Sequence, residues 1–153
     1  DSAYVSTGRV QWVFVNLPMP SHANAWAASE AALCAGAVAD RFWALHDRLF
    51  ESTDEWIGTD DPAPVLARYA REAGVPMDAF RDCVERDRVA PIILQDVIFG
   101  SRVTGTPTFI VISSVIAISA SLKPLTVCSP IRNSTAAACT RPTAGAGSTC
   151  TST

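Results

Sequence analysis

The pattern of hydrophobic and polar positions predicts a strand, a group of helices and a second strand, in that order along the chain. Residues 10–15 form a short apolar run between Gly8 and Pro18, typical of a strand buried on both faces of a parallel or mixed sheet. A second β-rich run covers residues 108–120. A long helical stretch between two strands is typical of an α/β or an α+β fold.

Five helices are predicted between these runs, because hydrophobic residues recur there every three or four positions. Capping residues, prolines in first turns and glycines after last turns mark where the helices start and end. Gly36 predicts the end of the first helix and Gly74 the end of the third. The predicted helices cover residues 23–36, residues 38–51, a stretch from Pro62 to Gly74, a short stretch that opens at Pro76, and residues 89–101.

Composition indicates a globular protein, because 48% of the 153 residues are hydrophobic and 18% are charged. A net charge of −3 provides no electrostatic footprint for nucleic acid. The longest apolar run, residues 109–122, is too short and too rich in serine to span a bilayer. We therefore expect neither a nucleic-acid partner nor a membrane span.

The last third of the chain differs sharply in composition from the rest. Every acidic residue lies at or before Asp96, and residues 103–153 carry only three charged side chains, those of Lys123, Arg132 and Arg141. Beyond Pro124 the chain is dominated by Ser, Thr, Ala and Gly, which cannot bury a core. Residues 121–153 are accordingly predicted to be an atypical, disordered tail.

The cysteines exclude two common kinds of site. No two of them form a CxxC, so neither a local dithiol nor a zinc-finger ligand pair is present. His22, Cys34 and His46 are spaced by twelve residues, which puts them on separate elements, and we predict no metal site. His46 is expected to pack between Phe42 and Phe50. The five cysteines are Cys34, Cys83, Cys128, Cys139 and Cys150.

Six short segments occur in an order that is typical of one protein family. They are RVQWVF (residues 9–14), Leu17-Pro18 with His22, AALCAG (31–36), RFWALHD (41–47), FRDCV (80–84) and VTGTPTF (103–109). Together they make residues 4–111 resemble the DsbA-like branch of the thioredoxin-fold disulfide oxidoreductases. The resemblance implies an α/β fold in which a helical domain is inserted into a thioredoxin-like sheet.

The resemblance also implies a division of the chain. Residues 1–20 and 102–120 would be remnants of the thioredoxin-like sheet, which is only partial here, and residues 21–101 would be the inserted helical domain. The family carries its CxxC on a strand–helix unit upstream of a segment like residues 4–8, and these 153 residues do not contain it. We therefore expect an N-terminally truncated fragment whose tail is an unrelated extension.

A site and a function follow from the same resemblance. Thr106 and Pro107 would form one wall of the active site, with a cis peptide bond and with the Thr106 backbone pairing to an extended substrate segment. The family exchanges disulfides with cysteine-containing proteins and a redox partner, without a cofactor, in an extracytoplasmic compartment (periplasmic, secreted or membrane-anchored). No catalytic nucleophile is present, so we expect this chain to be an inactive thiol–disulfide oxidoreductase.

Several alternatives remain open from the sequence. Cys34 and Cys83 are either two small buried residues or a structural disulfide of the helical domain. Cys34 is not expected to be catalytic, because it is predicted near the C-terminal end of a helix, where the partial negative charge of the helix dipole disfavours a thiolate. The chain could instead be a glutathione-binding protein similar to kappa-class transferases and isomerases, or a non-catalytic helical interaction module.

Overall fold

The computed structural model describes residues 4–5, 7–110 and 139–140, and most of these residues are helical. Two short strands, β1 (Val13–Phe14) and β2 (Cys139–Thr140), and a single 3₁₀ turn (Thr53–Glu55) complete the regular structure of this part of the chain. The five helices are α1 (Ala25–Ala39), α2 (Phe42–Glu51), α3 (Ala63–Glu72), α4 (Met77–Glu85) and α5 (Ala90–Gly100).

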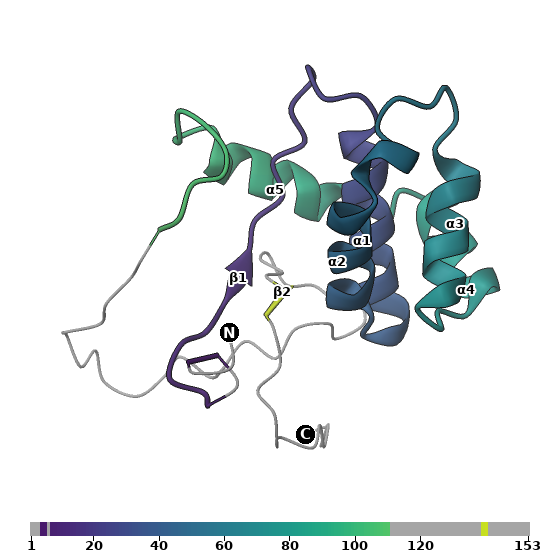
Figure 1. Ribbon diagram of the computed structural model, residues 1–153, viewed down its shortest axis with the longest axis horizontal. Coiled ribbons are helices and arrows are strands. Elements are labelled where there is room, and N and C mark those ends of the chain that lie inside the picture. Colours follow the sequence, from purple (N-terminus) through teal and green to yellow (C-terminus); the bar gives the residue numbers. More distant parts are fainter. Residues whose placement is uncertain (1–3, 6, 111–138, 141–153) are drawn as a thin grey trace.

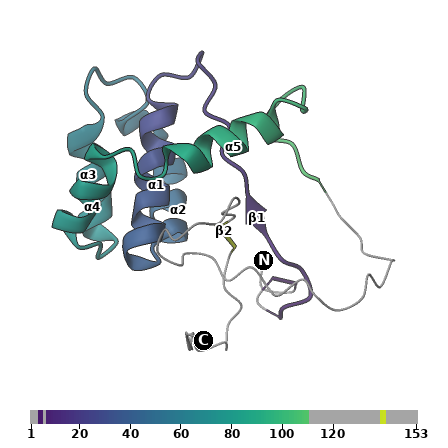
Figure 2. The ribbon, with the colours of Figure 1, turned by 180° about the vertical axis from the view of Figure 1, so that it is seen from behind.

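Helix α1 is the centre of the arrangement, because each of the other four helices contacts it. Ala and other apolar residues occupy every side of α1, and a helix that is apolar all round is stable only when neighbours cover it. In Figure 1, α1 and α2 lie beside α3 and α4, and Figure 2 shows the same group from behind. Helix α5 starts near α1 and extends away from the other helices toward β1.

The hydrophobic core lies among the helices and not against a sheet. Its largest fully buried side chains come from α1, α2, α3, α5 and the turn before α5, and they are Tyr69, Leu45, Ile93, Val89 and Cys34. The Trp56 indole closes one end of this core and donates a buried hydrogen bond of 3.0 Å to the Leu49 carbonyl. The helices therefore form a packed unit of their own.

The five predicted helices are all present, with one notable difference in their boundaries. Helix α1 continues past Gly36, which is buried inside it, and ends at Ala39 with Asp40 in the left-handed region at φ 55°. A glycine ends a helix only where the chain turns into the left-handed region, and here that turn comes at Asp40. At Gly74 the prediction is confirmed, since φ is +77° just after the last turn of α3.

The strand predicted over residues 10–15 is confirmed only at Val13 and Phe14, and its predicted burial on both faces is wrong. Only Val13 and Phe14 are in a strand, and they pair antiparallel with Thr140 and Cys139. Val13 is 44% exposed and Trp12 is 41% exposed, so this run is not covered on both faces. An apolar run is buried in a sheet only when strands flank it, and within the described residues β1 has a single two-residue partner.

The partial thioredoxin-like sheet is therefore not confirmed. Residues 108–110 have no regular structure, and residues 111–120 of the predicted second strand lie outside the described residues. The predicted tail also lies outside them, apart from residues 139–140. The division into sheet remnants at 1–20 and 102–120 and an inserted domain at 21–101 stays a prediction.

Asn24 fixes the start of α1 against the loop before α3. Its own backbone is in the left-handed region, at φ 62°. Its side-chain Nδ2 donates hydrogen bonds of 2.9 and 2.8 Å to the carbonyls of Trp56 and Thr59, and a longer bond of 3.4 Å to Ile57. One amide thus holds the backbone of a loop more than 30 residues further along the chain.

We expect Asn24→Gly to lower the free energy of unfolding by about 1–2 kcal/mol, because glycine keeps the left-handed backbone but loses these hydrogen bonds. Asn24→Ala should cost more, since alanine also disfavours a positive φ. Urea unfolding of the three proteins would measure both differences. A glycine variant as stable as the parent would show that the side-chain hydrogen bonds contribute nothing.

Candidate functional site

The loop that follows α5 contains the predicted site residues Thr106 and Pro107. At its start the Val103 N–H donates a hydrogen bond of 3.0 Å to the Gly100 carbonyl. Further along, the Thr108 hydroxyl donates a hydrogen bond to the Gly105 carbonyl. The peptide bond between Thr106 and Pro107 is cis, the conformation that the resemblance implies. Both residues are exposed to solvent.

One aromatic contact places the end of this loop beside β1. The rings of Trp12 and Phe109 have centroids 5.7 Å apart and are tilted by 51°. Neither ring is buried, since Trp12 is 41% exposed and Phe109 is 68% exposed. Trp12, beside β1, and Phe109, three residues after Thr106 along the chain, therefore form an exposed apolar edge.

Two polar residues, the buried Asn16 and the half-buried Asp96, anchor the segment after β1 to α5. The Asn16 backbone N–H and side-chain Nδ2 both donate to Oδ2 of Asp96, at 2.9 and 2.8 Å. Burial raises the pKa of Asp96 above its ordinary value, while the two hydrogen bonds from Asn16 act in the opposite direction. This contact holds the segment after β1 against the helix that leads into the loop.

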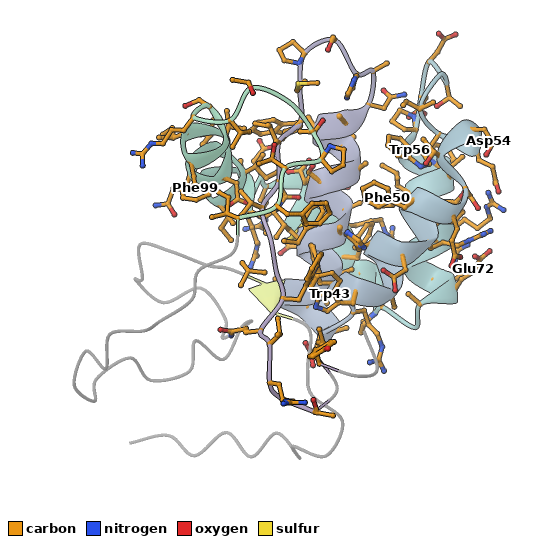
Figure 3. All side chains as sticks on the ribbon, turned by 60° about the vertical axis from the view of Figure 1, so that its left-hand side comes forward. Trp43, Phe50, Asp54, Trp56, Glu72 and Phe99 are labelled. Carbon is orange, nitrogen blue, oxygen red and sulfur yellow. A yellow bond between two sulfur atoms is a disulfide. The ribbon has the colours of Figure 1, made fainter. Side chains whose placement is uncertain are left out.

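His46 lies at the centre of an aromatic cluster that we define as Phe14, Phe42, Trp43, His46 and Phe50. Its ring is 4.5 Å from Phe14, 5.7 Å from Phe42 and 4.9 Å from Phe50, which confirms that it packs between Phe42 and Phe50. Figure 3 shows Trp43 and Phe50 toward opposite ends of α2. Because Phe14 belongs to β1, the cluster fixes β1 on α2, and this role is structural.

The structure joins Cys34 of α1 to Cys83 of α4 by a disulfide, with an S–S distance of 2.03 Å. Both residues are almost completely buried. Closing a loop of 49 residues stabilises the fold by about 4 kcal/mol in the chain-entropy model. Helix α1 extends to Ala39, so Cys34 does not lie in its last turn as the sequence suggested.

The disulfide and the loop are not brought together into one site. In Figures 1 and 2 the loop lies beyond the far end of α5, on the side of the molecule away from α3 and α4. A substrate held at Thr106 would thus meet no sulfur of the buried pair. Within the described residues no group of three or more His, Cys, Asp or Glu could hold a metal ion, and Cys34 is engaged in the disulfide.

A cavity of about 230 Å³ between α2 and α3 is a further candidate site. The Arg48 guanidinium lies over the Tyr69 ring, 4.7 Å from the ring centroid, and donates a hydrogen bond of 2.7 Å to the Ser52 hydroxyl. It also lies 3.8 Å from Glu55 and 3.6 Å from Glu72. Because the negative charges of these two carboxylates offset the positive charge of Arg48, the cavity has no net attraction for an anion.

The sequence alone did not single out Asn16, Asp96 or Glu30. One feature of the sequence could have identified both acids, Asp96 and Glu30. Asp96 and Glu30 are each the single charged residue of an otherwise apolar helix, α5 and α1 respectively. A charge in such a position is buried or half-buried and needs a partner.

No helix in the described part of the chain is long and apolar enough to cross a membrane.

Comparison with known families places the chain. Residues 1–126 match the family described as Thioredoxin, which covers most of the 153 residues. The chain therefore belongs to the thioredoxin family.

Among curated proteins, the chain is similar to the Na(+)/H(+) antiporter NhaA 3 of Salinispora tropica. The two are 39% identical over 105 residues, which cover 67% of this chain and 15% of the antiporter. The chain thus spans only a small part of the length of this relative. No solved structure matches the chain.

The Asp96 anchor leads to a pH-dependent prediction. Because the pKa of Asp96 is raised in the folded state, its contribution to stability is fully present below the ordinary value of 3.8 and is lost as pH rises through the folded pKa. Asp96→Asn cannot titrate, so the stability of the parent relative to this variant should decrease with rising pH and then level off. Urea unfolding at several values from pH 4 to 8 would measure this difference.

Asp96→Ala serves as the comparison, because it leaves both Asn16 donors without an acceptor. We expect it to cost about 1–3 kcal/mol at pH 7, more than Asp96→Asn does. A parent–Asn difference that stays constant with pH would show that Asp96 does not titrate with a raised pKa.

Proposed function

We propose that this chain is a DsbA-like member of the thioredoxin family and supplies the substrate-binding part of a thiol–disulfide oxidoreductase. The observation that carries the proposal is the family match over residues 1–126, which includes both the helical unit and the loop at Thr106–Pro107. The order of the six segments from residue 9 to residue 109 supports the DsbA-like branch in particular.

In this proposal the loop after α5 binds an extended, cysteine-containing segment of a substrate protein. The backbone of the exposed residue Thr106 would exchange hydrogen bonds with the substrate backbone, as a neighbouring strand does. Phe109 follows Thr106 by three residues, and the apolar edge that it forms with Trp12 would contact the side chains of the same segment. Affinity would then depend on the substrate backbone more than on its sequence.

The exchange reaction itself needs a dithiol or disulfide that the 153 residues do not provide. A substrate thiolate attacks one sulfur of a disulfide to form a mixed disulfide, and a second substrate thiolate releases it, so that two electrons pass from the substrate. The chain has no CxxC, and Cys34–Cys83 is buried away from the loop. The attacked disulfide would have to come from outside these residues, and the chain alone should not turn over.

We place this function in an extracytoplasmic compartment. The support is the Cys34–Cys83 disulfide, because disulfides of this structural kind persist in oxidising environments and are rare in the cytosol.

Substrate binding at Thr106 can be tested with a labelled, unfolded peptide that contains one cysteine. Thr106→Pro removes the backbone donor, and we expect it to weaken binding about 2- to 10-fold, the effect of one lost hydrogen bond. Thr104→Pro is the matched control, since Thr104 is exposed in the same loop and has no assigned contact to the substrate. Fluorescence anisotropy would measure both affinities.

Equal affinities for the parent and Thr106→Pro would contradict the proposed role of the Thr106 backbone. In an insulin-reduction assay with a dithiol reductant, the chain should add nothing to the rate of the reductant alone. Robust turnover would show that these residues carry a catalytic thiol after all. Saturable binding of glutathione in place of the peptide would instead favour the kappa-class alternative.

A second candidate function follows from the match to the antiporter. We propose that the chain corresponds to an accessory domain of an ion transporter, because it is 39% identical to a 105-residue part of a protein named as a Na(+)/H(+) antiporter. The remaining 85% of that protein has no counterpart in this alignment. The proposal therefore concerns only the aligned 105-residue part of the antiporter.

A chimaera tests this second candidate. The aligned segment of the antiporter would be deleted, or replaced by the corresponding segment of this chain, and Na⁺/H⁺ exchange measured in vesicles at several pH values. We expect deletion to change the rate or its pH dependence and the replacement to restore it. Normal exchange after deletion would exclude an accessory role.

A further inference from the structure

Glu30 is a buried acid in a helix that otherwise contains no charge. It is 7% exposed, and its Oε1 atom is buried without a hydrogen-bond partner. An ionised carboxylate with an unpartnered oxygen is costly in such a place, whereas a neutral acid is less so. The position of Glu30 therefore favours the protonated form.

The position of Glu30 is defined by the disulfide. Glu30 lies four residues before Cys34 on α1, which puts both on the same side of the helix. Asp87 lies four residues after Cys83, in the turn that follows α4. The bond between Cys34 and Cys83 holds α1 and α4 together, and Asp87 lies close enough to Glu30 to act on it through its charge and a side-chain hydrogen bond.

The two carboxyl groups differ in their surroundings. Asp87 is exposed and has a left-handed backbone at φ 49°, whereas Glu30 is buried. Burial, then the charge of Asp87 and then its hydrogen bond all raise the pKa of Glu30 above its ordinary value. One proton shared by such a pair resides on the buried member, while the exposed member keeps its charge.

We propose that Glu30 holds a proton in a hydrogen bond to Asp87, and that loss of this proton opens the α1–α4 contact and admits thiol reductants to the Cys34–Cys83 disulfide. Two carboxylates facing each other would repel across the contact, and Glu30 would then require water. The disulfide lies one turn away, so the same opening uncovers it. Low pH would keep the disulfide closed to reductants, and high pH would make it accessible.

Other charged groups on the neighbouring elements do not contribute to the raised pKa of Glu30, which comes from burial and Asp87. Arg86 and Arg88, which flank Asp87, both pair with Asp82. The remaining titratable or charged side chains of the helices around α1 are His46, Asp47, Arg48 and Glu51 of α2, Arg68, Tyr69, Arg71 and Glu72 of α3, Asp78, Arg81 and Glu85 of α4, and Asp96 of α5.

The redox step needs a dithiol or phosphine reductant from solution. A dithiol transfers two electrons and two protons, so that Cys34 and Cys83 become thiols and the reductant becomes a cyclic disulfide. Glu30 takes no part in this electron transfer. Its proton determines only how often the α1–α4 contact opens.

The sign of the pH dependence follows from linkage. Because the pKa of Glu30 is raised in the closed state, its stabilisation of that state is complete below the ordinary value of 4.5 and is lost as pH rises through the closed-state pKa. Within that window the open fraction increases with pH, by at most about tenfold per pH unit for one proton.

The test measures how fast the disulfide is reduced in the full chain between pH 5 and 8. A water-soluble phosphine is added, the reaction is quenched by alkylation, and mass spectrometry quantifies the peptides that contain Cys34 and Cys83. Each rate is divided by that of the urea-unfolded chain at the same pH, which removes the pH dependence of the reductant. We expect the normalised rate to rise with pH.

Glu30→Gln should remove this rise and give a slower rate than the parent at pH 8, because the amide donates to Asp87 at every pH. Glu85→Gln on α4 is the matched control, since Glu85 is exposed, and it should behave as the parent does. Asp87→Asn provides a second variant, as asparagine tolerates the positive φ and can donate to ionised Glu30. It should also flatten the profile.

A rise of equal size in the parent and in Glu30→Gln would overturn the proposal. If Glu30→Gln fails to fold, a parent-like rise in Asp87→Asn would overturn it independently. A normalised rate that does not change with pH in the parent would do the same.

Discussion

The rest of the structure depends on one constraint, which is that α1 is apolar on every side and must be covered on every side. Helices α2, α3, α4 and α5 all contact it, and the core side chains converge on it. The burial of hydrophobic surface is the main stabilising term, and the Cys34–Cys83 disulfide holds one side of this arrangement covalently. The single charge of α1, at Glu30, is consequently forced into the interior beside that disulfide.

The candidate loop depends on this arrangement through α5. The first half of α5 packs on the core through Ile93, and its second half extends toward β1. The Asn16–Asp96 hydrogen bonds and the Trp12–Phe109 contact then determine where the chain emerges from the helix. The loop is thus carried by the packed helical unit, while Thr106 and Pro107 stay exposed, as a binding segment requires.

Local signals in the sequence predicted the helical part well. Pro62 and Asp61 mark the start of α3, where the Asp61 carboxylate accepts a hydrogen bond of 3.0 Å from the Ala63 N–H. Gly74 marks its end. The signals failed where burial, and not local conformation, was in question: residues 10–15 were predicted to be buried because they are apolar, yet Val13 is exposed. Apolar character indicates that a residue can be buried, and only its neighbours in space decide whether it is.

The sequence by itself determined the five helices, the position of His46 between two phenylalanines, the absence of a CxxC and the loop that carries Thr106 and Pro107. These features follow from spacing, capping and residue type, which act over a few residues. The tertiary structure decided between the two interpretations of Cys34 and Cys83, brought Asn16 to Asp96 across 80 residues, and placed Glu30 opposite Asp87. Such contacts depend on how the helices pack around α1, and no periodicity within a single helix encodes which residue of another helix it will face.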